Sequence, residues 1–307
     1  MSKLIFDTDP GIDDAMALLL LHAIDDLDLR GITTVFGNAS IEDCTRNALY
    51  ICERFNLPYN VYQGAGIKLN GDAEEAYPDF VHGKDGLGDI DQSPISGLAQ
   101  EESAIDFIVR EVEAHANDIT LLAVGRLTNI ALALQQAPGL AGKISEIIIM
   151  GGALKAAGNV TPWAEANIHG DPEAAQVVFE SGVPLVMVGL DATMSNPMTR
   201  DHLNEVTAHL GDAGQFLRAI KECYLDFHAS QGVFDSFPIH DSTAVLRLAC
   251  PEFFEETAGR LDCVLHGDQR GRTKLVDLQP AHRVCLKSDN SRCLTYFDEV
   301  MKDCYGS

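Results

Sequence analysis

Four aspartates lie within eight residues near the start of the chain, in the stretch FDTDPGIDDA: Asp7, Asp9, Asp13 and Asp14. Carboxylates this close repel one another unless a positive charge lies between them. One of them can cap the helix expected after the Pro-Gly turn, because a carboxylate at a helix N-terminus accepts backbone N–H groups, but four cannot all do so. Clustered carboxylate oxygens are the ligands that hard cations such as Ca²⁺ or Mg²⁺ prefer. The stretch therefore predicts a divalent-cation site.

Two later segments carry polar side chains of a related kind. The segment GNVTPWAEANIHGDPEAA places Asn159, Glu165 and Asn167 close together, and amides and carboxylates suit vicinal hydroxyls, each of which donates and accepts hydrogen bonds. The segment SFPIHDSTAVLRLA places His240 directly before Asp241, at the start of an apolar helix. A histidine in this position is as often a structural residue as a catalyst, so this segment alone leaves both interpretations open.

The elements that position these residues alternate between strand and helix through the first two thirds of the chain. The expected strands are KLIFDTD, LRGITTVFG, YNVYQG, DITLLAVG, EIIIMGG and PLVMVGLDAT. The expected helices are residues 13–23, 41–55, 104–116, 127–136 and 172–180. Alternating strands and helices need crossover connections, so the pattern predicts an α/β fold with a mainly parallel, mixed central sheet and helices on both faces.

The pattern is less regular after about residue 197. We expect a helical region over about 200–228, a helix that begins near 239, a β-rich tail and a closing helix. The sequence contains no internal repeat, low-complexity tract or Pro/Ser-rich linker, which favours one domain over residues 1–307. The stretch of about residues 68–98 is rich in Gly, Asp and Pro, and loops of that length are usually functional or mobile. We expect it to be an active-site loop.

Polar or glycine-rich sequence follows five of the expected strands. In an open parallel sheet, ligands bind outside the carboxyl ends of the strands. This rule gathers the aspartate cluster, Gly37-Asn38, Val124-Gly125, Met150-Gly151-Gly152 and Asp191 at one rim. Turn formation alone explains single residues such as Asn38 or Asp191 equally well, because strand ends always need turn residues.

Composition limits the partners and the compartment. The chain has 307 residues and a formal net charge of −24, so nucleic acid and anionic membranes would be repelled, and no run of Lys or Arg offsets this charge. No apolar run reaches the roughly 18–20 residues that a membrane span needs, and MSKLIFDTD does not resemble a secretory signal, so we expect a cytoplasmic protein. Eight scattered cysteines without a Cys-x-x-Cys pair favour reduced, mostly buried thiols.

Taken in order, these motifs resemble the nucleoside hydrolase family, enzymes that cut the N-glycosidic bond of ribonucleosides. The resemblance runs from DTDPGIDDA through FGNAS, HGKDGLGD, AVGRLTNIALAL, IIIMGGA, GNVTPWAEANIHGDPEAA and VMVGLDAT to PIHDSTAV. It implies the inosine-uridine-preferring type, because members of that branch carry His directly before the last metal-binding Asp. It also implies either a preference for pyrimidine ribonucleosides or a broad inosine/uridine specificity, and a homotetramer or homodimer.

The resemblance also implies a role for each site residue. Calcium (Ca²⁺) would be held by Asp9, Asp14, Asp241 and the main-chain carbonyl of Val124. Asp9 would also take a proton from the attacking water, and His240 would protonate the departing base. The ribose would be bound by Asp13, Asn38, Asn159, Glu165 and Asn167, with Met150 lining the sugar pocket and Asp7 supporting the loop. The base side would be formed by His82 and by the stretch YLDFHASQGVF, which includes Phe227 and His228.

Two positions depart from the family pattern. Arg126 stands where the family's Gly-Pro-Leu-Thr-Asn has its turn proline, and Ala166 stands where an aromatic residue is common. The first change leaves the implied backbone ligand in place. The second removes a possible wall of the pocket and weakens the prediction of the substrate.

Three other functions compete with this one. A phosphatase of the haloacid dehalogenase type also has Asp-x-Asp after its first strand and binds Mg²⁺, but the continuation through Pro10 to Asp14 differs from its motif. A nucleoside- or sugar-binding protein without turnover would not need a proton donor such as His240 beside a metal ligand. A calcium-stabilised structural module would not need the hydroxyl-binding Asn and Glu residues.

Overall fold

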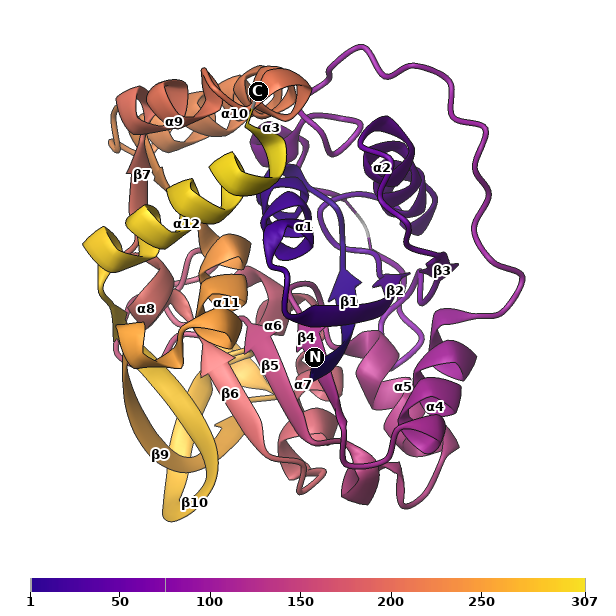
Figure 1. Ribbon diagram of the computed structural model, residues 1–307. Helices are drawn as coiled ribbons and strands as arrows, with labels where there is room; N and C mark the ends of the chain where they lie inside the picture. Colours follow the sequence, from indigo (N-terminus) through magenta and orange to yellow (C-terminus); the bar gives the residue numbers. More distant parts are fainter. Residues whose placement is uncertain (1, 75, 307) are drawn as a thin grey trace.

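Within residues 2–74 and 76–306, which the computed structural model describes apart from the side chains of residues 2 and 277–281, an eight-stranded sheet forms the centre of the molecule (Figure 1). In sheet order its strands are β3 (Val61–Gln63), β2 (Leu27–Thr34), β1 (Ser2–Thr8), β4 (Ile119–Ala123), β5 (Glu146–Met150), β6 (Leu185–Val188), β10 (Thr273–Ser288) and β9 (Phe254–Cys263). Neighbouring strands are parallel except for the antiparallel pair β9 and β10. The prediction of a mainly parallel, mixed sheet is confirmed.

Helices cover both faces of the sheet because side chains alternate between the faces along each strand. Phe6, Ile148 and Val186 belong to one apolar cluster, whereas their neighbours Ile5 and Ile147 belong to the other. The first cluster includes residues of α1 (Ile12–Ala23), α2 (Ile41–Arg54), α10 (Gly211–Ser230), α11 (His240–Ala249) and α12 (Asn290–Tyr305). The second includes residues of α4 (Ala104–Ala114), α5 (Thr128–Gln136) and α7 (Pro172–Glu180). The fold is a single α/β domain, as predicted.

The order of the strands reverses beside β1. The chain moves outward from β1 to β2 and β3, then returns to the other side of β1 and continues through β4, β5 and β6. At such a switch point the connections leave the sheet in opposite directions and open a crevice at the carboxyl ends of the strands. Asp9 follows β1 and Val124 follows β4, so the aspartate cluster lies at this crevice.

Two elements differ from the sequence prediction. The expected strand PLVMVGLDAT ends at Val188, and its last residues form the short helix α8 (Leu190–Thr193). A short apolar run can be buried either as a strand or as a helix, so its apolar character does not distinguish the two. The expected helix over about 200–228 is divided into α9 (Arg200–Thr207) and α10, and Gly211 at the division has a φ of +53°, a conformation that favours glycine.

The remaining elements are short. Strands β7 (Pro197–Thr199) and β8 (Ser236–Pro238) form a separate two-stranded sheet just before α9 and α11. Helix α6 (Ala166–Gly170) precedes α7, and 3-10 turns occur at Leu140–Lys143, Pro251–Phe253 and Gly267–Gln269. The β9–β10 ribbon extends beyond the other strands at the edge of the sheet (Figure 1).

The expected loop of residues 68–98 contains the short helix α3 (Asp79–His82), and its residue 75 lies outside the described residues. The later part of the segment runs along the outside of α2 (Figure 1). Asn47 on α2 donates to the carbonyl of Asp85 at 2.8 Å, and Glu53 accepts the N–H groups of Ser96 and Gly97, both at 2.9 Å. These bonds attach the segment to α2 on the side of the molecule that carries the aspartate cluster.

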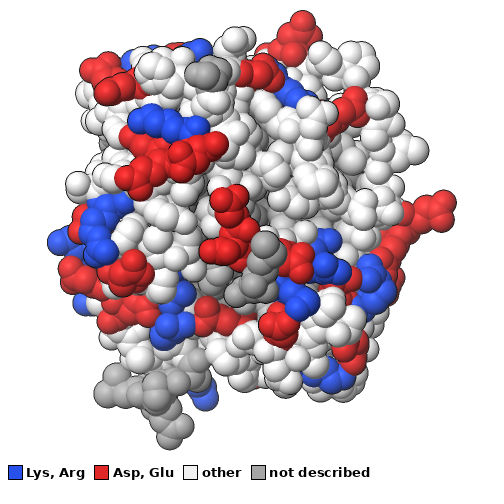
Figure 2. Space-filling model, in the orientation of Figure 1, with Lys and Arg blue, Asp and Glu red and all other residues white. Residues whose placement is uncertain are grey.

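The surface carries acidic and basic side chains close together. On the face drawn in Figure 2, Asp and Glu side chains alternate with Lys and Arg side chains.

In the described part of the chain, no helix has both the length and the apolar character needed to cross a membrane. The eight cysteines, all of which lie in the described residues, are free thiols, and most of them are buried, as predicted.

Helix α1 is apolar on every side and lies between the sheet, α11 and α12, so its leucines carry much of the core. We expect Leu19→Ala, at a fully buried position, to lower the free energy of unfolding by about 2–5 kcal/mol, because it leaves a cavity. The measurement is urea unfolding followed by circular dichroism. Leu98→Ala is the matched control, since Leu98 is 85% exposed, and equal losses in the two variants would contradict this packing.

Candidate functional site

Asn38 joins two of the aspartates that follow β1. Its N–H donates to Asp9 Oδ2 and its Nδ2 donates to Asp14 Oδ2, both at 2.9 Å. Asp14 also accepts from Thr8 Oγ1 at 2.5 Å and from the N–H of Gly11 at 2.9 Å, where it caps α1. A side chain on Gly11 would collide with Asn38 and His82, which explains the glycine in the turn. The Pro-Gly turn thus packs the two carboxylates against the end of β2.

Asp241 reaches the same place from the start of α11. Asp13, Asp14 and Asp241 are all buried, and each offers an oxygen within 4.8 Å of the others. Asp9 Oδ1 and Asp13 Oδ1 are buried and have no hydrogen-bond partner among the described residues. A buried carboxylate oxygen without a partner is costly, and a bound cation would satisfy it. The donor set therefore fits a hard divalent cation.

The pKa values of these carboxyl groups reflect the same crowding. Burial raises the pKa of Asp13 to about 7, helped by the neighbouring charge of Asp14. Burial, followed by the charges of the other aspartates, raises the pKa of Asp9 and of Asp241 well above the ordinary range. A cation that binds here must displace protons or favour the ionised forms, so its binding is expected to strengthen as the pH rises.

The geometry differs in part from the predicted ligand set. The close group of three contains Asp14 and Asp241 but includes Asp13, which the sequence assigned to the sugar. Asp9 lies beside this group, since the charges of Asp13 and Asp14 both act on it. The carbonyl of Val124 accepts a hydrogen bond from Asn167 Nδ2 at 2.7 Å, and a carbonyl oxygen retains a second lone pair. The assignment of Asp9 and Val124 as ligands stays a prediction.

The residues predicted to bind ribose lie at different depths. Glu165 is buried beneath the rim, where it caps α6 and accepts three backbone N–H groups, from Gly152, Asn167 and Ile168. Asn167 is half-buried and also donates to the carbonyl of Met150, at 3.1 Å. Asn159 is exposed and accepts the N–H of Ala166. Asn167 thus lies at the crevice, while Glu165 shapes the loop around it.

Two of the three predicted histidines, His82 and His228, contact Tyr224. The ring of His82 stacks on Tyr224 at 5.7 Å between centroids, and the ring of His228 meets Tyr224 edge-on at 4.8 Å. His240 Nδ1 is 2.8 Å from Thr193 Oγ1. Burial lowers the pKa of His82 and of His240 to about 3 and that of His228 to about 4, so the three rings are neutral near neutral pH.

Phe227 is half-buried and packs against Phe80, with ring centroids 5.8 Å apart. Phe80 belongs to α3 and is 72% exposed, and Phe234 beyond the end of α10 is 73% exposed. The predicted base-side stretch therefore presents apolar rings next to the histidines.

Two contacts hold this side together, and neither followed from the sequence: the expected base-side stretch begins at Tyr224, but its bond to Asp13 was not foreseen, and Thr193 was not singled out. Tyr224 donates to Asp13 Oδ2 at 3.3 Å, so it connects the histidines to the carboxylates. It lies one helical turn before His228, and this spacing places both on one face of α10. Thr193 was hidden because its segment was expected to be a strand.

Arg126, one of the two departures from the family pattern, is buried beside the cluster. It pairs with Glu74 of the 68–98 segment, and its guanidinium lies over the ring of Phe36 at 4.4 Å. Its charge lowers the pKa of both Asp9 and Glu165 against the larger effect of burial. The arginine thus offsets part of the negative charge and ties the segment to the rim.

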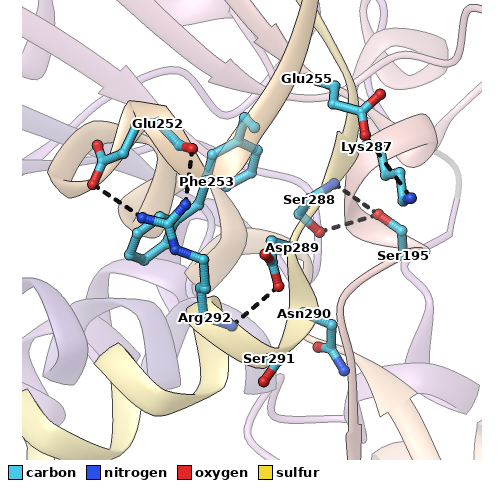
Figure 3. Close-up of a pocket in the computed structure, with 11 residues that line it drawn as sticks. Ser195, Glu252, Phe253, Glu255, Lys287, Ser288, Asp289, Asn290, Ser291 and Arg292 are labelled. Carbon is cyan, nitrogen blue, oxygen red and sulfur yellow. Dashed lines mark hydrogen bonds and ion pairs between the residues drawn. The ribbon is translucent and has the colours of Figure 1, made fainter.

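A cavity of about 590 Å³ lies elsewhere, at the start of α12 (Figure 3). Its polar groups already pair with one another: Arg292 lies near Glu252 and over the ring of Phe253, and Asp289 caps α12. None of the predicted site residues lines it. The cavity gives no indication of a ligand.

The whole arrangement has counterparts among known proteins. Residues 4–295 match the family model described as inosine-uridine preferring nucleoside hydrolase. Uridine nucleosidase 1 of Arabidopsis thaliana is 42% identical over 84% of this chain and 76% of its own. The pyrimidine-specific ribonucleoside hydrolase RihB of Escherichia coli (strain K12 / DH10B) is 38% identical over 81% of this chain and 79% of its own.

Solved structures agree with these sequence matches. A plant nucleoside hydrolase has a TM-score of 0.94 at 32% identity, with 98% of both chains covered. A purine-preferring ribonucleoside hydrolase from Gardnerella vaginalis has a TM-score of 0.93 at 33% identity, with 99% of both chains covered.

The raised pKa of Asp13 predicts a pH-dependent stability in the metal-free protein. The group has a pKa of 3.8 in model compounds and about 7 in the fold, so its stabilising contribution is complete below about pH 4 and is lost as the pH rises through 7. In chelator, wild type should therefore lose thermal stability relative to Asp13→Asn between about pH 5 and about pH 7.5. The measurement is the Tm of both proteins at each pH.

A divalent cation, added as Ca²⁺ or Mg²⁺, should raise the Tm of wild type more at the higher pH than at the lower one, because a cation at this cluster would bind the ionised carboxylates. Asp25→Asn, at an exposed position after α1, serves as the control and should leave the pH dependence unchanged. A difference between wild type and Asp13→Asn that stays constant with pH would contradict the shifted pKa.

Proposed function

The chain belongs to the inosine-uridine preferring nucleoside hydrolase family and is an N-glycosyl hydrolase, and we propose that it hydrolyses pyrimidine ribonucleosides, uridine above all, to free base and ribose. The observation that carries the proposal is the buried group of Asp13, Asp14 and Asp241, which meets the histidine-lined wall through Tyr224. The match over residues 4–295 favours this reaction over the phosphatase alternative.

The chemistry of the bond explains the crowded carboxylates. Breaking a ribosyl C1′–N bond builds positive charge on the sugar in an oxocarbenium-like transition state. Carboxylate and amide oxygens fixed around the sugar stabilise that charge more than they stabilise the neutral substrate, which raises the turnover number. The buried, partly unpartnered oxygens of Asp9 and Asp13 suit this task.

We propose Ca²⁺ as the cation, held by Asp9, Asp14, Asp241 and the carbonyl of Val124. When bound, the cation would act as a Lewis acid that lowers the pKa of the attacking water. All four residues lie at the crevice beside β1, and three of them are buried carboxylates. The second lone pair of Val124 leaves room for this role beside the Asn167 hydrogen bond.

Asp9 is the proposed general base. Its Oδ2 is held by the N–H of Asn38, whereas its Oδ1 is unpartnered. Two glycines keep the space around this carboxylate open, since a Cβ on Gly37 would lie 1.9 Å from Oδ2 and one on Gly125 would lie 2.7 Å from Oδ1. The fixed oxygen orients the group, and the free oxygen can take a proton from water.

The sugar and the base would be held on opposite sides of this centre. We propose that ribose hydroxyls bind to Asp13, Asn38, Asn159, Glu165 and Asn167, beside Met150. The base would lie against His82, Phe227 and His228, with His240 as the proton donor. Negative charge that builds on the departing base raises the pKa of the adjacent His240 ring and so favours this donation.

The preference for pyrimidines is supported by the relatives. A uridine nucleosidase and a pyrimidine-specific hydrolase are 42% and 38% identical to this chain, whereas the purine-preferring structure is 33% identical. A homo-oligomer, a tetramer or a dimer, and a cytoplasmic location complete the proposal. The free thiols suit a reducing compartment.

The test is ribose release from inosine, uridine, cytidine and adenosine, in phosphate-free buffer, with and without exhaustive chelation. We expect ribose from uridine at the highest kcat/KM, complete loss after chelation, and recovery when Ca²⁺ is restored. Release that survives removal of the metal would refute the cation's role. Inosine or adenosine as the best substrate would refute the pyrimidine preference.

Asp9→Asn should lower kcat by about 10²–10⁴-fold, the usual contribution of a general base, and change KM little. Steady-state kinetics with uridine at saturating Ca²⁺ gives both constants, and calorimetry verifies that the variant still binds the metal. Asp212→Asn is the matched control, because this carboxylate lies at the start of α10 and pairs with Arg54 on the surface. An unchanged kcat in Asp9→Asn would exclude Asp9 as the base.

A further inference from the structure

The His240 ring is held from behind by a buried hydroxyl. Thr193 is fully buried in α8, and its Oγ1 lies 2.8 Å from His240 Nδ1. The other ring nitrogen, Nε2, has no hydrogen bond to a described residue and, unlike Nε2 of His228, is not sealed from solvent. The ring therefore has one nitrogen fixed by the protein and one nitrogen open to the crevice.

Helix α8 and helix α11 are locked together around this contact. Asn196, just after α8, donates from Nδ2 to Thr243 Oγ1 at 2.8 Å, and its carbonyl accepts the N–H of Ile239. Thr243 Oγ1 donates in turn to the carbonyl of Ile239 at 2.6 Å. These bonds fix the first turn of α11, which carries His240, against the end of β6 and α8.

The hydrogen positions follow from the partners of the hydroxyl. Among the described residues, His240 Nδ1 is the acceptor within hydrogen-bond distance of the Thr193 hydroxyl. Because a buried O–H group without an acceptor is costly, we expect Thr193 to donate to Nδ1. When Thr193 donates to Nδ1, the neutral imidazole must carry its hydrogen on Nε2, because one ring nitrogen accepts and the other donates. The open nitrogen is then the donor.

We propose that Thr193 is a positioning residue for the reaction: its hydroxyl fixes the His240 tautomer and ring orientation so that Nε2–H points to the departing base. The inference rests on the proposed function and adds no bond-making step to it. A pyrimidine leaves with the electron pair of the broken C1′–N bond, and the charge spreads to the ring carbonyl oxygen next to that nitrogen. An N–H donor held at that oxygen stabilises the charge as it develops.

Leaving-group dependence separates this role from a general structural one. Thr193→Val keeps the shape of the side chain and removes the hydroxyl. We expect it to lower kcat for uridine by about tenfold, roughly the effect of one lost hydrogen bond, and to change kcat for p-nitrophenyl riboside by less than about twofold. The activated riboside needs no donor at its leaving group. Thr193→Ser should restore most of the uridine rate.

Two further variants sharpen the result. Thr243→Val is the matched control, because Thr243 is as buried as Thr193 and is hydrogen-bonded in the first turn of α11 but does not bond to the His240 ring. It should lower stability without changing the ratio of the kcat for uridine to the kcat for p-nitrophenyl riboside. In a His240→Ala background, Thr193→Val should have no additional effect on uridine, since the ring through which it acts is gone. Equal losses on both substrates, or additive losses with His240→Ala, would overturn the proposal.

A spectroscopic readout stands apart from activity. Ring ¹⁵N chemical shifts of the histidine-labelled protein, with the His240 signals assigned by comparison with His240→Ala, report which nitrogen carries the hydrogen. We expect the Nε2–H form in wild type and in Thr193→Ser, and a mixture in Thr193→Val. An Nδ1–H ring in wild type would refute the tautomer assignment even if uridine hydrolysis is confirmed. Failure of uridine hydrolysis with an intact Nε2–H ring would instead refute the proposed function.

Discussion

The structure depends on one electrostatic constraint, the confinement of four buried carboxylates at the switch point of the sheet. Burial raises the pKa of Asp9, Asp13 and Asp241, and the charges of neighbouring members raise these values further: Asp14 acts on all three, Asp13 acts on Asp9 and Asp241, and Asp9 acts on Asp241. The surrounding fold offsets this charge only in part, through hydrogen bonds from Asn38, Thr8 and Tyr224 and through the nearby charge of Arg126. Such a site is stabilised by positive charge. In the proposed reaction, a bound cation would supply this charge in the resting state, and the site would also stabilise the positive charge that builds on the sugar in the transition state.

The hydrogen-bond partners of the acidic residues separate supporting roles from chemical ones. Glu165 and Asp191 each accept three backbone N–H groups, so their first role is to shape the loops that follow β5. A carboxylate has about four lone-pair sites, which leaves Glu165 one for the proposed ribose hydroxyl. Asp7, Asp9 and Asp13 each keep a buried oxygen that has no hydrogen-bond partner among the described residues. Folding rarely tolerates such an atom unless function requires it. The two histidines differ in their hydrogen bonds as well. His228 Nε2 is buried and has no partner among the described residues, whereas His240 Nδ1 is bonded to Thr193.

The sequence predicted the features that depend on local pattern and on the rule that ligands bind at the carboxyl ends of parallel strands. The sheet class and the helices on both faces followed from periodicity. The grouping of Asp241 with the aspartates of residues 7–14 came from the resemblance to the nucleoside hydrolase family. The roles of Tyr224 and Thr193 could not be predicted in this way, because each depends on one contact between distant parts of the sequence. Tyr224 contacts Asp13, and Thr193 contacts His240. Thr193 was further obscured by a buried run that suits a strand and a short helix equally. The same limit applies to Asp13, whose closeness to Asp241 depends on how α1 packs against α11.

Base preference has a different physical origin from the reaction itself. A purine-preferring ribonucleoside hydrolase superposes on this chain with a TM-score of 0.93, so under the proposed pyrimidine preference the two would share a backbone and differ in base. The preference would then come from side chains on the proposed base side, where Tyr224, His228 and the Phe80–Phe227 pair lie on α3 and α10. This side is attached to the rest of the fold less firmly than the carboxylates, because Phe80 is largely exposed and α3 is a short helix within a long connecting segment. Substitutions on this surface would therefore change the proposed base preference and leave the aspartate cluster and the core packing intact.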